Sequence, residues 1–232
     1  MMEPLIHVEA LRKMYGNKAA LDGVSLDLFP GRVVGLIGHN GSGKTTLLKI
    51  LAGLIRPYEG RAEIAGHAPG VESKAKVAFL PSEDFLNREL TVAEAVSLYS
   101  RFFADFDERK TLRLLDFFSI EANSRLKELS TGMREKVKVS LVMSRRACVY
   151  LLDEPINGVD PGAREGILEG ILRDFPQESL LVISTHLVSD VESFLDDVVM
   201  LKEGRVIHTQ NADDLRAETG LSIDALTRKE FR

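Results

Sequence analysis

A glycine-rich segment early in the sequence could bind phosphate groups. It reads Gly38-His39-Asn40-Gly41-Ser42-Gly43-Lys44-Thr45-Thr46. The apolar run VVGLI precedes it and a predicted apolar helix follows it, which is the strand–loop–helix setting of the pattern GxxxxGK(S/T). The glycines let backbone amides turn inward, the helix start adds its dipole, Lys44 supplies a positive charge, and the Thr45 hydroxyl can bind Mg²⁺. A simple turn would need neither Lys44 nor Thr45, so we predict a triphosphate site.

Two neighbouring carboxylates could complete that site. Asp153 and Glu154 follow the apolar run VYLL, where a predicted strand ends. Asp153 can hold Mg²⁺ through water, and Glu154 can activate an attacking water as a general base. His186 follows the run LLVIS and can hydrogen-bond a γ-phosphate oxygen. A carboxylate pair is common at a strand exit, and a lone histidine is more often only a partly buried polar residue. In the company of the phosphate motif, both favour catalysis.

These residues need a sheet to position them. The predicted strands are Leu5–Glu9, Val24–Leu28, Val33–Ile37, Ala62–Ala65, Lys76–Leu80, Cys148–Leu152, Leu180–Ser184, Val198–Leu201 and Val206–His208. The runs VVGLI, CVYLL and LLVIS are apolar at nearly every position, which is typical of parallel strands covered on both faces. The segment VSLDL alternates, which indicates a sheet with one solvent-facing side. Gly204 predicts a hairpin turn between the last two strands.

Helical patterns alternate with the strands. The predicted helices span Lys44–Ala52, begin at Thr91 with Glu94 in a capping box, run from Asp107 through Phe118, begin at the N-cap Ser130, and run from Pro161 toward Asp174. Residues 85–146 are therefore mainly helical. Most of the phenylalanines fall in or near this region, namely Phe79, Phe85, Phe102, Phe103, Phe106, Phe117 and Phe118. We expect most of these rings to form a small second core, and the alternative is that one or two form an exposed docking patch.

Composition limits the partners and the cellular compartment that we expect for this chain. With 30 Lys and Arg against 35 Asp and Glu, the formal net charge of −5 gives no electrostatic reason to expect nucleic acid or anionic lipid as a partner. Cys148 is the single cysteine, so we expect no internal disulfide and a reducing cytosol. No apolar run approaches the roughly eighteen residues of a membrane span, and no signal pattern opens the sequence. We therefore expect contact with a membrane only through a partner.

The motifs together resemble the ATP-binding subunits of ABC transporters, and the resemblance covers essentially the whole chain. Tyr15 stands at the aromatic A-loop, the segment Gly38–Thr46 is similar to Walker A, and LSTGM at 129–133 resembles the signature. The sequence DEP at 153–155 resembles Walker B, NGVD at 157–160 the D-loop, and His186 the switch histidine. The order and spacing of these elements are those of the family.

The resemblance implies an α/β fold of the P-loop NTPase type, with a mainly parallel sheet core, an N-terminal antiparallel β subdomain and a helical insertion subdomain. It implies one ABC-type ATPase domain over residues 1–232. Residues 1–84 and 147–210 would form the catalytic core with the β subdomain, residues 85–146 the helical signature subdomain, and residues 211–232 a short C-terminal tail.

The resemblance also implies roles for individual residues. The implied ATP-binding residues are Tyr15, which would stack on adenine, and Gly38, His39, Asn40, Gly41, Ser42, Gly43, Lys44, Thr45 and Thr46. The implied catalytic residues are Lys44, Glu154 and His186, and the implied Mg²⁺ ligands are Thr45 and Asp153. Ser130, Thr131 and Gly132 would face the γ-phosphate of an ATP bound to a second ATPase subunit, with Asp160 in the D-loop. Ser130 would serve equally well as a plain helix cap.

Some positions depart from the family pattern. The signature reads LSTGM where LSGGQ is usual, so Thr131 replaces a glycine and Met133 a polar residue. Ser82 stands where the Q-loop usually has Gln, and it is too short to reach Mg²⁺ in the same way, so water or Glu83 would have to substitute. Ile156 replaces the usual Thr or Ser after the Walker B proline, and the sequence alone offers no reason. We still expect hydrolysis, because Lys44, Asp153, Glu154 and His186 are all present.

Two functions remain open from the sequence. The first is an ATPase subunit on the inner face of the cell membrane, bound to a separate transmembrane permease and paired with an identical or related ATPase chain. Met133 and the short tail favour export over import. The second is a soluble ABC-type ATPase that acts in cofactor assembly or on ribosomes. The transported substrate is not encoded in these motifs, because the permease would recognise it.

Overall fold

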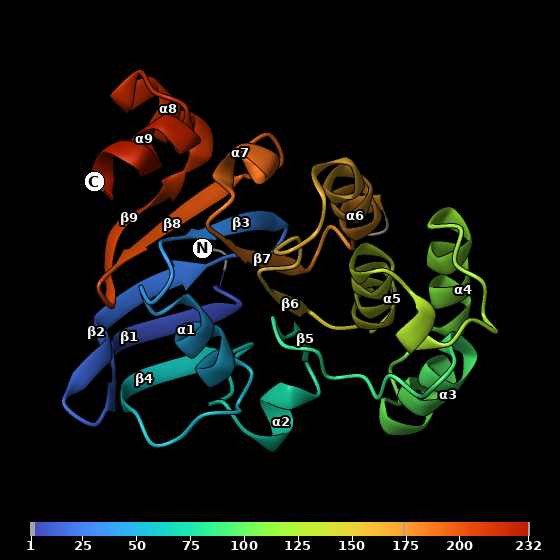
Figure 1. Cartoon of the computed structure of the whole chain (residues 1–232). Coiled ribbons are helices and arrows are strands. Elements are labelled where there is room, and N and C mark those ends of the chain that lie inside the picture. The colour runs from blue at the N-terminus through green and yellow to red at the C-terminus, as the bar shows by residue number, and fades with distance from the viewer. Residues whose placement is uncertain (1–2, 174, 232) are drawn as a thin grey trace.

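Two β-sheets frame the molecule in the computed structural model, which describes residues 3–173 and 175–231 (Figure 1). The larger sheet has the strand order β5-β6-β7-β3-β8-β9. Its strands are β3 (Arg32–Ile37), β5 (Val77–Leu80), β6 (Val149–Asp153), β7 (Leu180–Thr185), β8 (Asp197–Lys202) and β9 (Arg205–Asn211). The first five strands in that order are parallel, and β9 pairs antiparallel with β8. The predicted hairpin is confirmed, with Gly204 at φ 77° in its turn.

The smaller sheet is antiparallel and has the order β2-β1-β4. Its strands are β1 (Ile6–Tyr15), β2 (Lys18–Leu28) and β4 (Glu59–Ile64). The predicted first strand, which ended at Glu9, is too short. The strand continues beyond Ala10, whose φ of 48° marks a bulge where the register shifts between Val8 and Leu11. The bulge changes the phase of the buried positions, so simple alternation stops there.

Alternate residues of the central strands enter two different cores. In β7, Leu180 and Val182 pack toward the smaller sheet, whereas Leu181 and Ile183 pack toward helices on the opposite face. The helices are α1 (Lys44–Leu51) on the first face and α5 (Thr131–Met143), α6 (Pro161–Arg173), α7 (Val188–Val191), α8 (Ala212–Thr219) and α9 (Ile223–Glu230) on the second. Burial on both faces explains the apolar runs. The expected extension of α6 to Asp174 lies outside the described residues.

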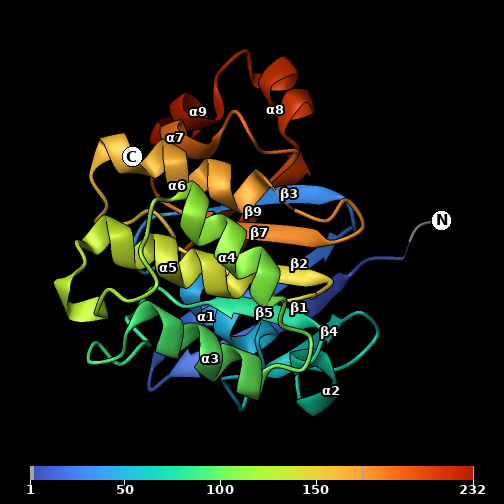
Figure 2. The same cartoon turned by 90° about the vertical axis from the view of Figure 1, so that its right-hand side faces the viewer.

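A helical region lies beside the larger sheet, and its helices α3, α4 and α5 lie side by side (Figure 2). The remaining helical elements are α2 (Val71–Lys74), α3 (Val92–Phe102), α4 (Glu108–Phe117) and the 3₁₀ turn η1 (Leu126–Glu128). The capping box is confirmed, since the backbone N–H groups of Thr91 and Glu94 each donate to the other residue's side chain. Asp107 and Ser130 cap α4 and α5 as predicted.

The aromatic residues of this region form the expected second core. The Tyr99 ring contacts the rings of Phe85, Phe103 and Phe106, with centroid separations of 5.1 to 6.3 Å. Phe102 and Phe85 are the exceptions, because 75% and 36% of these residues are exposed. The docking patch stays a prediction. Among the described residues, no helix has the length and hydrophobicity that a membrane span needs.

Candidate active site

The glycine-rich segment forms a tight loop between β3, which ends at Ile37, and α1, which begins at Lys44. A Cβ atom at Gly38 would lie 2.4 Å from the Leu201 carbonyl oxygen, so no larger residue fits. Gly43 has a φ of 111°, and a Cβ there would lie 2.4 Å from the Ala20 carbonyl oxygen. The loop is therefore pressed against β2 and β8, and its path depends on glycine at these two positions.

The Lys44 side chain is buried against the phosphate loop. The side chain is only 5% exposed, and its ammonium group donates to the Gly38 carbonyl at 2.6 Å. The same Nζ lies 3.2 Å from Glu154 Oε1. This places the positive charge of the loop against the carboxylate that follows β6, as a shared phosphate site requires.

Asp153 is fully buried at the end of β6. Its Oδ2 accepts hydrogen bonds from the hydroxyls of Thr45 (2.8 Å) and Ser82 (3.1 Å), and its Oδ1 accepts one from Ser184 (2.6 Å). Within the described part of the chain, no Lys, Arg or His forms an ion pair with it. A buried carboxylate with only hydroxyl partners is costly unless a cation joins it, so the site suits a cation.

Mg²⁺ fits this donor set. It binds proteins through oxygen atoms, typically one or two carboxylates, and completes its shell with water and substrate phosphate. Thr45 and Asp153 would hold the ion here, and it would neutralise negative charge on the phosphates.

Glu154 is held in an uncommon backbone conformation, with φ at 52°. Its backbone N–H donates to Ser184 Oγ at 3.0 Å, which fixes the turn after β6. The side chain is 9% exposed, and its Oε2 lies 2.9 Å from His186 Nδ1. The carboxylate is thus oriented by Lys44 on one side and His186 on the other, a geometry suited to accepting a proton from a bound water.

A pocket of about 390 Å³ lies against the phosphate loop and Glu154, whereas Asp153 and His186 do not line it. The predicted residues that line it are Tyr15, His39, Asn40, Gly41, Gly43, Lys44, Thr45, Thr46, Ser82 and Glu154. Gly38, Ser42 and Asp153 are buried. Ser42 Oγ has no hydrogen-bond partner there among the described residues. Tyr15 is half exposed, and one face of its ring lies 5.1 Å from Lys13 Nζ.

Comparison with known proteins identifies the family. The ABC transporter family model matches residues 21–157. The chain belongs to the ABC transporter family. The chain is 32% identical over 238 residues to the daunorubicin resistance ATP-binding protein of Streptomyces coeruleorubidus, covering 99% of this chain and 75% of that relative. It is 32% identical over 212 residues to the Nod factor export ATP-binding protein I of Ralstonia nicotianae, covering 88% of this chain and 66% of that relative.

A solved ATP-binding subunit of an ABC transporter has the same fold. It superposes with a TM-score of 0.84 at 30% sequence identity, covering 97% of this chain and 98% of the other. The expected α/β fold with a mostly parallel sheet and an antiparallel β subdomain is confirmed. As an ABC ATPase, the chain binds and hydrolyses ATP, and its relatives are subunits of transporters rather than ribosomal or assembly factors.

The pocket of this ABC ATPase also contains residues that we did not predict. Lys18, Ala20 and Asn157 line it. Lys18 pairs with Tyr15 across the β1–β2 turn, so a hairpin assignment there would have located it. Ser184 contacts both acidic residues, and its position opposite Asp153 in the β6–β7 register was accessible from the predicted strand ends.

The structure shows the contacts of three residues that depart from the ABC pattern. Ser82 reaches Asp153 directly, whereas Glu83 forms an ion pair with Lys49 at 2.7 Å. Glu83 therefore does not take over the Q-loop position in this structure. Ile156 is fully buried in the core on the helical face of the sheet, which explains an apolar side chain there. Thr131 Oγ1 accepts a hydrogen bond from the Arg134 guanidinium group at 3.3 Å.

The signature residues and the D-loop aspartate do not share the pocket. Among the described residues that line it, none is Ser130, Thr131, Gly132 or Asp160. Ser130 and Thr131 are exposed at the start of α5, and Gly132 is buried with a virtual Cβ 3.8 Å from Asp160 Oδ2. The signature and Asp160 therefore lie together, apart from the phosphate loop of the same chain, whereas Asn157 at the start of the D-loop lines the pocket.

Proposed function

We propose that this ABC ATPase powers export of a solute through a separate transmembrane permease. The observation that carries the proposal is the convergence of the phosphate loop with Asp153, through Thr45, and with Glu154, through Lys44, because it brings phosphate-binding, metal-binding and proton-accepting groups together. The printed names of two relatives, concerned with Nod factor export and daunorubicin resistance, support export over import. Pairing with a permease would hold the chain on the cytoplasmic face of the membrane.

Each site residue takes a role from its geometry. Lys44 and the loop amides would bind the phosphates, and Thr45 and Asp153 would hold Mg²⁺. Glu154 would accept the proton of the attacking water, and His186 would orient Glu154 and contact the terminal phosphate. Tyr15 would stack on adenine through the ring face opposite Lys13. The 3.2 Å ion pair of Lys44 with Glu154 brings the phosphate-binding cation and the proposed base to the same place.

The exposed signature supports a two-subunit site. The start of α5 presents backbone N–H groups and the positive end of a helix dipole, which suit a phosphate. Because Ser130 and Thr131 do not line their own chain's pocket, an ATP bound by one subunit would meet the signature of another. The second subunit would be an identical or a related ATPase chain, arranged head to tail.

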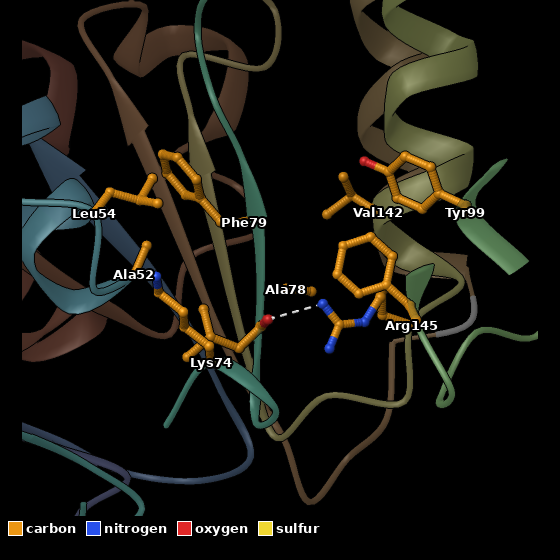
Figure 3. A pocket seen from close by; sticks show the side chains of 10 residues that line it. Ala52, Leu54, Lys74, Ala78, Phe79, Tyr99, Val142 and Arg145 are labelled. Carbon is orange, nitrogen blue, oxygen red and sulfur yellow. Dashed lines mark hydrogen bonds between the residues drawn. The ribbon is translucent and has the colours of Figure 1, made fainter. Parts of the chain in front are cut away.

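A second pocket is suited to the permease (Figure 3). It has a volume of about 190 Å³ and lies between the larger sheet and the helical region. Its walls are mostly apolar and include Leu54, Phe79, Tyr99, Phe103 and Val142. Lys74 contributes a positive charge and has no ion-pair partner within the described ranges. An apolar permease side chain beside a carboxylate would match this lining.

Arg145 makes this pocket sensitive to movement between the two regions. Its guanidinium group donates to Asp105 Oδ1 at 2.8 Å, lies 4.1 Å from the centre of the Phe103 ring, and donates to the Val77 carbonyl of β5 at 3.2 Å (Figure 3). A permease segment seated here would touch the sheet and the helical region at once. Movement of that segment would therefore displace β5 and, with it, Ser82, which lies two residues after the end of β5.

Co-expression with a candidate permease tests the proposal. Leu54→Glu and Phe102→Glu should reduce co-purification of the two proteins, because each places a charge at or beside the apolar pocket. Phe29→Glu, at an exposed phenylalanine that lines a different pocket, is the control. Equal recovery of all variants would contradict docking at this pocket, and failure of the native chain to co-purify with any membrane protein would favour a soluble factor.

A further inference from the structure

An aromatic residue beyond the family motifs touches the phosphate loop. Phe231 follows α9, and its ring meets the His39 imidazole edge to face, with a centroid separation of 4.9 Å and an interplanar angle of 89°. Lys202 secures this end of the helix, since its ammonium group donates to the Glu230 carbonyl and lies 5.9 Å from the Phe231 ring. The contact joins residues from opposite ends of the described chain.

His39 is well placed to control the shape of the loop. Its carbonyl oxygen accepts hydrogen bonds from the Ser42 backbone N–H at 3.1 Å and from Lys44 Nζ at 3.3 Å. The residue lines the ATP pocket but is itself exposed. Its imidazole has no hydrogen bond to any other described residue, so the Phe231 ring is the contact that restrains it.

The opposite end of α9 is fixed to the element that follows the switch histidine. The Asp224 backbone N–H, in the first turn of α9, donates to Glu192 Oε2 at 3.0 Å. Glu192 ends α7, which begins two residues after His186. Ile223 and Leu226 bury the inner face of α9 in the core. The helix therefore connects the switch side of the active site with the phosphate loop, and Figure 1 shows α7, α8 and α9 grouped together.

We propose that Phe231 is a positioning residue for ATP binding. Its ring holds His39 and thereby keeps the loop amides and Lys44 in the arrangement that receives the phosphates. A loop held in its binding conformation loses less conformational entropy when the ligand binds. The inference rests on ATP binding at this pocket but not on export or on the identity of the permease.

Loss of the ring should weaken ATP binding without slowing catalysis at saturation. An edge-to-face contact of this kind corresponds to about a two- to tenfold change in affinity. Phe231→Ala and Phe231→Leu should therefore raise the Kd and the KM for ATP by that factor and leave kcat close to that of the native chain. Phe231→Leu preserves an apolar side chain against the core, so a loss shared by both variants reports the ring rather than the packing. Phe29→Ala is the control at an exposed phenylalanine away from the pocket.

A spectroscopic experiment tests the same contact directly. The chain contains no Trp, so Phe231→Trp supplies a single fluorescent reporter that keeps an aromatic ring against His39. ATP should change its emission and bind with nearly native affinity, and adding His39→Ala should abolish the change. Unchanged ATP affinity in Phe231→Ala and Phe231→Leu would overturn the proposal. Tighter ATP binding by these two variants would also overturn it, because the contact would then oppose binding. An emission of Phe231→Trp that does not change when ATP is added would overturn it as well. If ATP hydrolysis stayed native in any of these cases, the proposed ATPase function would still stand.

Discussion

Thr45 and Asp153 stand 108 residues apart in the sequence, and the Thr45 hydroxyl donates a 2.8 Å hydrogen bond to Asp153 Oδ2. Thr45 lies in the first turn of α1, after the phosphate loop, and Asp153 ends the buried strand β6 of the larger sheet. Their oxygen atoms therefore meet at the point where Mg²⁺ and the triphosphate are expected.

Glu154→Gln should suppress ATP turnover by about 10² to 10⁴-fold, because the amide cannot accept the proton of the attacking water. ATP binding should remain, since Lys44 and the loop are intact. Phosphate release and binding of a fluorescent ATP analogue measure the two effects separately. Glu165→Gln, on the exposed surface of α6, is the control. Native phosphate release from Glu154→Gln would refute the base assignment.

Lys44→Ala should weaken ATP binding itself, by about tenfold or more, because it removes a charge-assisted contact with the phosphates. It also leaves Glu154 without the cation 3.2 Å away. Equilibrium titration with ATP measures the affinity, and Lys127→Ala at an exposed position serves as the comparison. Affinity equal to that of the native chain would show that Lys44 does not contact phosphate.

Ser82→Ala should raise the Mg²⁺ concentration needed for half-maximal ATPase activity by about three- to tenfold, since a hydrogen bond to a buried carboxylate is lost. Thr45 and Ser184 would still orient Asp153, so activity at high Mg²⁺ should largely recover. The measurement is an ATPase titration with Mg²⁺, with Ser100→Ala as the exposed control. A native Mg²⁺ profile in Ser82→Ala would mean that this hydroxyl has no part in the metal site.

Asp107 should make the stability of the helical region depend on pH. The pKa of its carboxyl lies below the usual range, chiefly because the Lys110 backbone N–H donates to it, with Arg146 adding to the effect. A lowered folded-state pKa stabilises the fold above the ordinary carboxyl pKa, and this contribution is lost as pH falls through the lowered value.

Asp107→Asn keeps a good helix cap but carries no charge. The native chain should therefore be more stable than this variant at pH 5 to 7, and the difference should shrink below about pH 4. Urea unfolding followed by circular dichroism measures it at each pH. A stability difference that stays constant down to pH 3 would contradict the assignment.

The sequence predicts those parts of the site whose residues are close together in the chain or lie at the ends of apolar runs. The phosphate loop is contiguous, and its strand and helix are unambiguous, so its position follows from Gly38 to Thr46 alone. Asp153 and His186 end apolar runs, and strands of a parallel sheet place such ends at a common edge. The caps at Thr91, Asp107 and Ser130 were predictable for the same reason, because capping depends on neighbours three residues away.

Contacts between distant segments were not predictable in this way. The Ser82 hydroxyl reaches Asp153 because β5 and β6 are adjacent. The hydrophobic pattern of VAFL predicts a strand but not which strand pairs with it. The phase change at Ala10 depends on a bulge that the smaller sheet imposes. The contact of Phe231 with His39 requires α9 to fold back onto the sheet, and the tail has no motif that records it.

Tyr15 belongs to the three-stranded sheet, whereas the phosphate loop follows β3 of the six-stranded sheet. A nucleotide gripped at its base and at its phosphates would therefore bridge two separately built sheets. Cleavage of the terminal phosphate would alter contacts with the loop after β3, whereas the proposed stacking of the purine on Tyr15 would not change. Release of the cleaved phosphate and release of ADP would thus be separate steps controlled by different parts of the protein. Substitutions in the β1–β2 hairpin would change the rate of ADP release and leave the rate of phosphate release unchanged.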